Sequence, residues 1–274
     1  MKIYLNGNFI EQEEARVNIL DPGFLYGQGL FETMRVYNES VFRIDSHIQR
    51  LLKSLAIINI KLALEAKVLK EAVKECLKKN GLKDAYVRLT LWQGEDKINI
   101  AILAKSYDFL KKEDYQKGFK AIISGAFRQN ELSALSRIKS SNYLHLLLAY
   151  QEAKKNRADE ALLLNTGGFL AEASRANIFL VKDNCLVTPS LDCGVLPGIT
   201  RDTVLAIAGK EKLKVIETKI RRADLEKSDE AFLTNSLLEI MPLVALENKP
   251  INKATPGRIT ELILKRYRAL ALNE

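Results

Sequence analysis

The sequence predicts an α+β protein built from two domains, and three features of the chain support this prediction. Strand-like runs open the chain and recur before residue 106, with two amphipathic helical patterns between them. Residues 106–118 are charged and have no clean hydrophobic period, which is typical of a linker. Beyond the linker, strand-like runs and helical patterns continue to the end of the chain. We therefore expect an N-terminal α+β domain over residues 1–105 and a C-terminal α/β domain over residues 119–274.

In the N-terminal part, the first helical pattern covers residues 48–55, where apolar side chains follow i, i+3, i+4, i+7 spacing. The second covers residues 68–77 and stops at Asn80-Gly81. The expected strands of this part are 2–6, 86–92 and 99–105.

In the C-terminal part, the same criteria predict five strands and three helices. The expected strands are 119–124, 160–165, 176–182, 215–219 and 230–234. The expected helices are about 140–155, 200–209 and 258–270.

Composition excludes several classes of site. The two histidines exclude a multi-histidine metal centre, and the three scattered cysteines indicate neither a zinc site nor a disulfide framework. The formal net charge is +8, but the basic residues are interleaved with Asp and Glu along the chain. This pattern disfavours nucleic-acid binding and favours an anionic cofactor or substrate.

Neither a membrane-length apolar run nor the apolar run of a signal peptide is present, so we expect a cytoplasmic protein.

Lys139 is a candidate nucleophile. It precedes an expected helix whose first residues, Ser140 and Ser141, suit capping. The positive potential near a helix N-terminus lowers the pKa of a lysine and favours the neutral amine that attacks a carbonyl. The alternative is a solvated surface lysine.

Two further segments suit the binding of a charged ring and a phosphate. Glu172 stands ahead of an apolar strand, where a carboxylate can hold a protonated ring nitrogen. Residues 196–202 have the composition of a tight turn that opens a helix, whose first N–H groups can bind a phosphate. The alternatives are a turn glutamate and an ordinary helix start capped by Thr200.

Arg50 and Ser236 complete the polar candidates. Arg50 lies in the first helix but away from its apolar face, where it can bind a phosphate bidentately. Ser236 belongs to the polar run Thr234-Asn235-Ser236, which follows the apolar residues 231–233. Small hydroxyl and amide residues at the end of a strand suit the floor of a polar pocket. A surface arginine and a simple strand-to-turn transition are the alternatives.

From Asp21 onward the sequence resembles the fold-type-IV pyridoxal-phosphate enzymes. This family contains branched-chain aminotransferases, D-amino-acid aminotransferases and 4-amino-4-deoxychorismate lyases. The resemblance covers nearly the whole chain and follows the family's order of motifs. These motifs are residues 23–33, 47–51, 136–143, 170–179, 194–201 and 234–242.

The resemblance implies two α+β domains with pyridoxal 5′-phosphate in the cleft between them, and a homodimer. It implies that Lys139 forms the Schiff base with the cofactor, while Glu172 binds the pyridine nitrogen. Tyr143 would lie near the phenolic oxygen, and the phosphate would be bound by Arg50, Ile199, Thr200 and Ser236. Ala173 stands where many family members have glycine, a change that we expect the fold to tolerate.

The resemblance also implies that an amino substrate forms an external aldimine and that Lys139 abstracts its Cα proton. Residues 234–242, and residues 23–33 with Arg35, look most like the lyase group. The specific expectation is therefore 4-amino-4-deoxychorismate lyase, which releases pyruvate and 4-aminobenzoate. The alternative is an aminotransferase for branched-chain L- or D-amino acids. Residues 93–98 lack the Arg-x-His carboxylate trap of the well-known bacterial D-type enzymes, which disfavours that type.

Three residues are candidates for the substrate side. Tyr86 and Arg88 are positioned like residues that line the substrate in the branched-chain group, and Arg35 and Arg88 are candidate clamps for a carboxylate. The alternative is a set of strand residues with structural ion pairs. The expected partner is a small anionic amino substrate, with no nucleic acid and no membrane.

Overall fold

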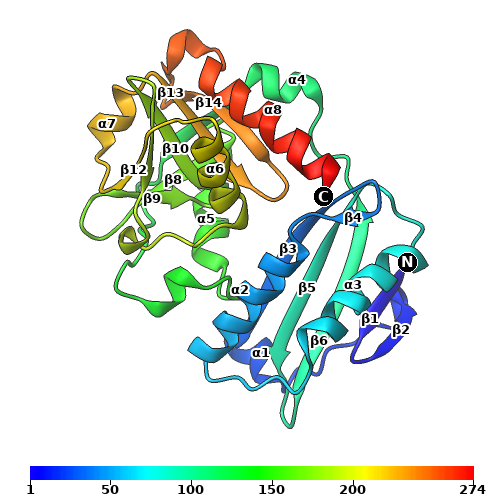
Figure 1. The fold of residues 1–274 in the computed structure, drawn as a ribbon. Coiled ribbons are helices and arrows are strands. Elements are labelled where there is room, and N and C mark those ends of the chain that lie inside the picture. The colour runs from blue at the N-terminus through cyan, green and yellow to red at the C-terminus, as the bar shows by residue number, and fades with distance from the viewer. The chain divides into compact units, whose positions relative to one another are not determined.

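The computed structural model describes residues 1–274, which form two compact units (Figure 1). Unit 1 consists of Met1–Asp108, Ile138–Asn142 and Ala271–Glu274, and unit 2 consists of Phe109–Arg137 and Tyr143–Leu270. Each unit combines one sheet with helices, so the expected α+β class is confirmed. No helix combines the length and the apolar character needed to cross a bilayer.

Unit 1 is built on a six-stranded antiparallel sheet with the order β2-β1-β6-β5-β3-β4. Helices α2 (Ile44–Ile57) and α3 (Ala66–Lys79) pack on the sheet, and the short α1 (Pro22–Tyr26) leads into it. The strands are β1 (Lys2–Leu5), β2 (Asn8–Glu11), β3 (Gly29–Tyr37), β4 (Ser40–Val41), β5 (Ala85–Gln93) and β6 (Ile98–Ser106).

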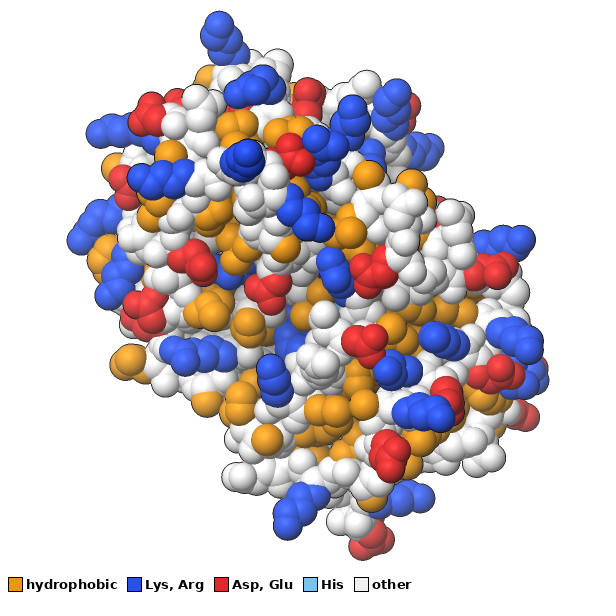
Figure 2. Space-filling view, in the orientation of Figure 1, with side chains coloured by type: hydrophobic (Ala, Val, Ile, Leu, Met, Phe, Trp, Pro, Cys, Tyr) orange, Lys and Arg blue, Asp and Glu red, His pale blue; other side chains and the backbone are white.

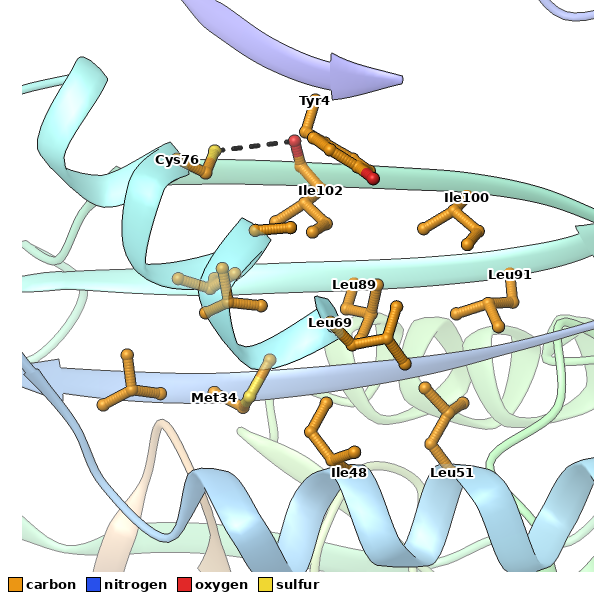
Figure 3. Close-up of a cluster of buried hydrophobic side chains, with 14 of the residues drawn as sticks. Tyr4, Met34, Ile48, Leu51, Leu69, Cys76, Leu89, Leu91, Ile100 and Ile102 are labelled. Atoms are coloured by element: carbon orange, nitrogen blue, oxygen red, sulfur yellow. Dashed lines mark hydrogen bonds between the residues drawn. The ribbon is translucent and has the colours of Figure 1, made fainter. Parts of the chain in front are cut away.

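The alternation of side chains along β5 separates the core of unit 1 from a polar face. Leu89 and Leu91 are buried with Met34 of β3 and Ile48 of α2, as Figure 3 shows. Cys76 of α3 joins this cluster and donates a weak hydrogen bond to Ile102 O at 3.6 Å. Successive residues of a strand point to opposite faces. The half-buried residues of β5, which include Tyr86 and Arg88, therefore lie on the other face of the sheet.

Unit 2 is built on a nine-stranded mixed sheet with the order β12-β11-β10-β13-β14-β7-β8-β9 and β15 paired to β14. The strands are β7 (Phe119–Ile123), β8 (Glu160–Leu164), β9 (Leu170–Ala173), β10 (Asn177–Lys182), β11 (Cys185–Pro189), β12 (Val215–Thr218), β13 (Glu230–Asn235), β14 (Glu239–Leu246) and β15 (Lys249–Pro250). The helices are α4 (Lys112–Lys117), α5 (Leu144–Lys155), α6 (Ile199–Lys210), α7 (Arg222–Glu226) and α8 (Arg258–Asn273), whose residues from Ala271 on belong to unit 1.

The units differ from the expected domains in two places. Residues 106–118, expected as a linker, contain helix α4, whose Tyr115 is buried in the core of unit 2. Residues 138–142, expected in the C-terminal domain, belong to unit 1 because their backbone pairs with β3. Phe31 N donates to Lys139 O at 2.9 Å, and Ser141 N donates to Gly29 O at 2.8 Å. The expected start of a helix at Ser140 is wrong, since α5 begins at Leu144.

Charged side chains of both signs are mixed over the face of the molecule shown in Figure 2. Several acidic residues take part in surface ion pairs, such as Lys182–Asp229 at 3.0 Å and Arg222–Glu247 at 2.5 Å. Such exposed pairs contribute little to stability, so they indicate a solvated surface.

Candidate active site

Lys139 lies on unit 1, in the segment that pairs with β3. Its Nζ is 4.5 Å from the centroid of the Phe31 ring, and Arg88 Cζ is 3.8 Å from the same centroid. The helix argument for Lys139 is wrong, because α5 begins at Leu144 and no side chain caps its start. What positions Lys139 is its backbone pairing with β3 and the contact of its amine with an aromatic ring.

A buried cluster of Glu32, His47 and Arg50 lies beside this segment on unit 1. Arg50 Nε donates to Glu32 Oε1 at 2.8 Å, and Arg50 Nη2 donates to Glu32 Oε2 at 2.6 Å. His47 Nδ1 is 2.7 Å from Glu32 Oε2. One edge of the Arg50 guanidinium is thus held by a carboxylate that the sequence analysis did not identify, and its phosphate-binding role stays a prediction.

Charge states in this cluster follow from burial and close contacts. Burial raises the pKa of Glu32, but the Arg50 charge and the hydrogen bonds from His47 and Arg50 outweigh it and lower that pKa to about 2. Burial lowers the pKa of His47, and the charges of Arg50 and Lys139 lower it further, against the opposing effect of Glu32. At neutral pH we therefore assign an ionised Glu32 and a neutral His47 whose Nδ1–H donates to Glu32.

The three expected substrate residues have different surroundings. Arg35 is buried and donates to Val36 O and to Ala85 O, the latter at 2.9 Å. Its guanidinium also lies over the rings of Tyr37 and Tyr107, at 4.5 and 3.8 Å. These contacts favour the structural alternative for Arg35. Tyr86 and Arg88 lie on the polar face of β5 and are half-buried.

In unit 2, Glu172 lies inside β9 rather than in a turn and is 6% exposed. Its carboxylate accepts three hydrogen bonds: from Gln129 Nε2 at 3.0 Å, from Asn177 Nδ2 at 3.2 Å and from Leu196 N at 3.1 Å. Gln129 and Asn177 were not among the candidate residues expected from the sequence. A buried carboxylate held in one orientation can accept a hydrogen bond from a protonated ring nitrogen.

Helix α6 begins at Ile199 with Gly198 as its N-cap. The alternative, a helix start capped by Thr200, is wrong because Thr200 lies within the first turn and no side chain caps the helix start. Thr200 is buried, whereas Ile199 is half-buried. An uncapped start of a twelve-residue helix presents backbone donors and the positive end of the helix dipole, which suit a phosphate.

Tyr143 and the segment around Ser236 converge on the turn after β9. Tyr143 Oη donates to Ser174 O at 3.1 Å, and Asn235 Nδ2 donates to Arg175 O at 2.8 Å. Asn235 Oδ1 accepts from Leu237 N and Leu238 N, at 2.8 and 2.7 Å, so it fixes the backbone on both sides of Ser236. Asn235 belongs to the polar run expected at the floor of a pocket, but its contacts with the backbone were not expected.

The groups on each unit are of the kinds that pyridoxal phosphate requires. On unit 1, the Lys139 amine suits a carbonyl carbon. On unit 2, the buried Glu172 carboxylate suits a protonated ring nitrogen, and the uncapped start of α6 and the Ser236 hydroxyl suit a phosphate.

A sequence model of the amino-transferase class IV family matches residues 29–246. The chain belongs to this family. Among solved structures, the Escherichia coli branched-chain amino acid aminotransferase is similar, with a TM-score of 0.95 and 28% identity over 100% of this chain and 95% of that one. The PLP-form of the enzyme from Thermobaculum terrenum has a TM-score of 0.90 and 27% identity over 99% and 94%. These similarities confirm the expected fold-type-IV architecture.

Two class IV relatives differ in activity. The Pseudomonas aeruginosa branched-chain-amino-acid aminotransferase is 31% identical over 97% of this chain and 91% of its own length. The Bacillus subtilis aminodeoxychorismate lyase is 36% identical over 89% and 86%.

Proposed function

We propose that this class IV enzyme is a pyridoxal-phosphate-dependent amino-acid aminotransferase that acts on branched-chain amino acids. The observation that carries the proposal is the similarity to branched-chain aminotransferases over the whole chain, both in sequence and at a TM-score of 0.95 in structure. The geometry around Lys139 and Glu172 supports the same cofactor chemistry.

When bound, pyridoxal phosphate supplies the electron sink that weakens the Cα–H bond of an amino substrate. Lys139 Nζ would hold the cofactor through its carbonyl carbon, and its amine would serve as the acceptor and donor of the proton at the substrate Cα. Glu172, oriented by its three donors, keeps a proton on the ring nitrogen. The N–H groups of Ile199 and Thr200 and the hydroxyl of Ser236 bind the phosphate.

On the substrate side, we retain Arg88 and Tyr86 and assign Arg35 to the structure of the sheet. Arg88 is half-buried and its guanidinium lies over the Phe31 ring, which Lys139 also contacts. A guanidinium held in this way near the Lys139 amine suits the carboxylate of an amino acid.

A second candidate is the 4-amino-4-deoxychorismate lyase activity that the sequence analysis placed first. It is supported by the 36% identity to the lyase from Bacillus subtilis. The aminotransferase is favoured over it, because the structural neighbours described above are branched-chain aminotransferases and match at least 99% of this chain.

A half-reaction tests the proposal. The holoenzyme is mixed with L-leucine or L-valine and no acceptor, and the visible absorbance is followed. An aminotransferase loses the visible band of its lysine-bound cofactor as the amine form accumulates, and releases the keto acid. Lys139→Ala should lack that band from the start. A wild-type band that persists with every amino acid, together with pyruvate release from aminodeoxychorismate, would identify the lyase instead.

We further propose a homodimer through the segment before β3. Six large apolar side chains of this segment are between 51% and 75% exposed: Val17, Ile19, Leu20, Phe24, Leu25 and Tyr26. A segment with this many exposed large apolar side chains suits an interface with a second copy. Phe24→Lys should shift the protein towards the monomer in analytical ultracentrifugation, whereas the control Leu272→Lys, a lone exposed leucine, should not.

A further inference from the structure

Asn177 lies between the Glu172 carboxylate and the turn that leads into α6. It is the first residue of β10, pairs in register with Thr234 of β13 and is 5% exposed. Its Nδ2 donates to Glu172 Oε2 at 3.2 Å and to Leu196 O at 3.0 Å. Both hydrogens of the amide are therefore used, which fixes the orientation of the side chain.

Leu196 is held from both sides by the same two residues. Its N donates to Glu172 Oε2 at 3.1 Å, while its O accepts from Asn177 Nδ2. Three hydrogen bonds thus close a ring that joins Glu172, Asn177 and Leu196. Leu196 is followed by Pro197 and by Gly198, the N-cap of α6, so this ring connects the carboxylate to the start of the helix.

Gly198 shows how closely Asn177 approaches the helix start. A Cβ atom on Gly198 would lie 2.0 Å from Asn177 Oδ1, far inside van der Waals contact. The φ of Gly198 is −75°, which any residue adopts, so its conformation does not require glycine. The need for glycine comes instead from Asn177, because the amide that donates to Glu172 and Leu196 places its oxygen against Gly198.

We propose that Asn177 is a positioning residue that couples the Glu172 carboxylate to the N-terminus of α6. It keeps the partner of the ring nitrogen and the phosphate-binding donors at a fixed separation, acting through Glu172 and Leu196. The inference rests on the proposed function, because it assigns these two groups to the two ends of one cofactor.

The first experiment is a double-mutant cycle on binding of pyridoxal phosphate to the apoprotein, followed by visible absorbance. Asn177→Ala should weaken binding by about tenfold or more, since it removes a donor to a buried carboxylate. Gly198→Ala should also weaken binding in the wild type but much less in the Asn177→Ala background, because the oxygen that its Cβ strikes is gone. The control Asn165→Ala removes a buried asparagine that donates to Cys193 O at 3.4 Å and accepts from Phe169 N at 2.9 Å. Neither hydrogen bond involves Glu172 or Leu196, so this variant should bind pyridoxal phosphate normally.

The second experiment separates coupling from a structural role. Pyridoxal and inorganic phosphate serve as separate probes of the two ends. In the wild type, phosphate should raise the affinity for pyridoxal, and pyridoxal should raise the affinity for phosphate by the same factor. Asn177→Ala should reduce this factor towards one. Asn177→Asp keeps an oxygen against Gly198 but replaces the amide donor, so it should also reduce the coupling factor. This variant takes the place of Asn177→Ala if the alanine variant does not fold.

The outcomes distinguish the two proposals. Additive effects in the cycle, or an unchanged coupling factor in a folded Asn177 variant, would overturn the role of Asn177. A wild-type protein that binds no pyridoxal phosphate would instead overturn the proposed function.

Discussion

Replacing the buried Glu32 with glutamine tests the charge cluster on unit 1. Glu32→Gln keeps the size of the side chain but removes the charge that Arg50 and His47 contact at 2.6 to 2.8 Å. The Arg50 guanidinium, only 11% exposed, then loses the carboxylate that compensates it. Because breaking one partner of a buried pair leaves an uncompensated charge, we expect unit 1 to be strongly destabilised.

The magnitude follows from the pKa of Glu32, which falls from its usual 4.5 to about 2. At about 1.4 kcal/mol for each tenfold change in proton affinity, this corresponds to about 3 kcal/mol of stability at neutral pH. The folded state binds the Glu32 proton less tightly than the unfolded state. The contribution is therefore complete above pH 4.5 and is lost as the pH falls towards about 2. Glu32→Gln should lack this contribution at every pH.

Trp92 gives a clean assay, because it is the only tryptophan and lies in unit 1. Urea unfolding followed by its fluorescence should show the variant about 3 kcal/mol less stable at pH 7, with a smaller difference at pH 3. The control Glu11→Gln removes a carboxylate whose side chain is 45% exposed and pairs with Lys2, and it should give no resolvable change in stability. A stability difference between wild type and Glu32→Gln that stays constant from pH 7 to pH 3 would refute the reasoning.

Three further substitutions have distinct expected results. Burial raises the pKa of Glu160 against the opposing effects of Arg175 and Ser174, so the wild type should lose stability as the pH rises above 4.5. In thermal unfolding, Glu160→Gln should lack this loss of stability with rising pH. Arg35→Met should destabilise unit 1 by about 2 kcal/mol in urea unfolding followed by Trp92 fluorescence, while the variant still binds the cofactor. Loss of cofactor binding would show that Arg35 belongs to the active site. Arg88→Met should raise the KM for the amino acid about tenfold or more with the visible band intact, and an unchanged KM would make Arg88 structural.

The fold was predictable where one face of an element is buried. Helix α2 and strand β5 show clean periods of 3.6 and 2, and both were expected within a few residues of their bounds. Strands β3 and β14 were not expected. All residues of β3 except Thr33 are buried, so it has no alternation of apolar and polar residues. Strand β14 is buried throughout and contains Pro242, a residue that argues against a central strand.

The partners of the candidate residues were less predictable than the residues themselves. Lys139, Glu172 and Arg50 were identified from motif order, but nothing in the sequence indicated which groups hold them. Glu172 takes a hydrogen bond from Gln129, 43 residues earlier in the chain, and Arg50 pairs with Glu32 of another element. Such contacts depend on the register of strands and on helix packing, which local patterns do not encode.

Strand β3, which the sequence did not predict, contacts several of the candidate site residues of unit 1. Its consecutive residues Phe31 and Glu32 point to opposite faces of the sheet. The ring of Phe31 contacts the Lys139 amine, while the carboxylate of Glu32 binds Arg50. The backbone of the same strand pairs with the segment that carries Lys139. The match to the class IV family begins at residue 29, the first residue of this strand. One strand therefore positions both Lys139 and Arg50. A shift in its register by one residue would exchange the Phe31 ring and the Glu32 carboxylate between the two faces of the sheet.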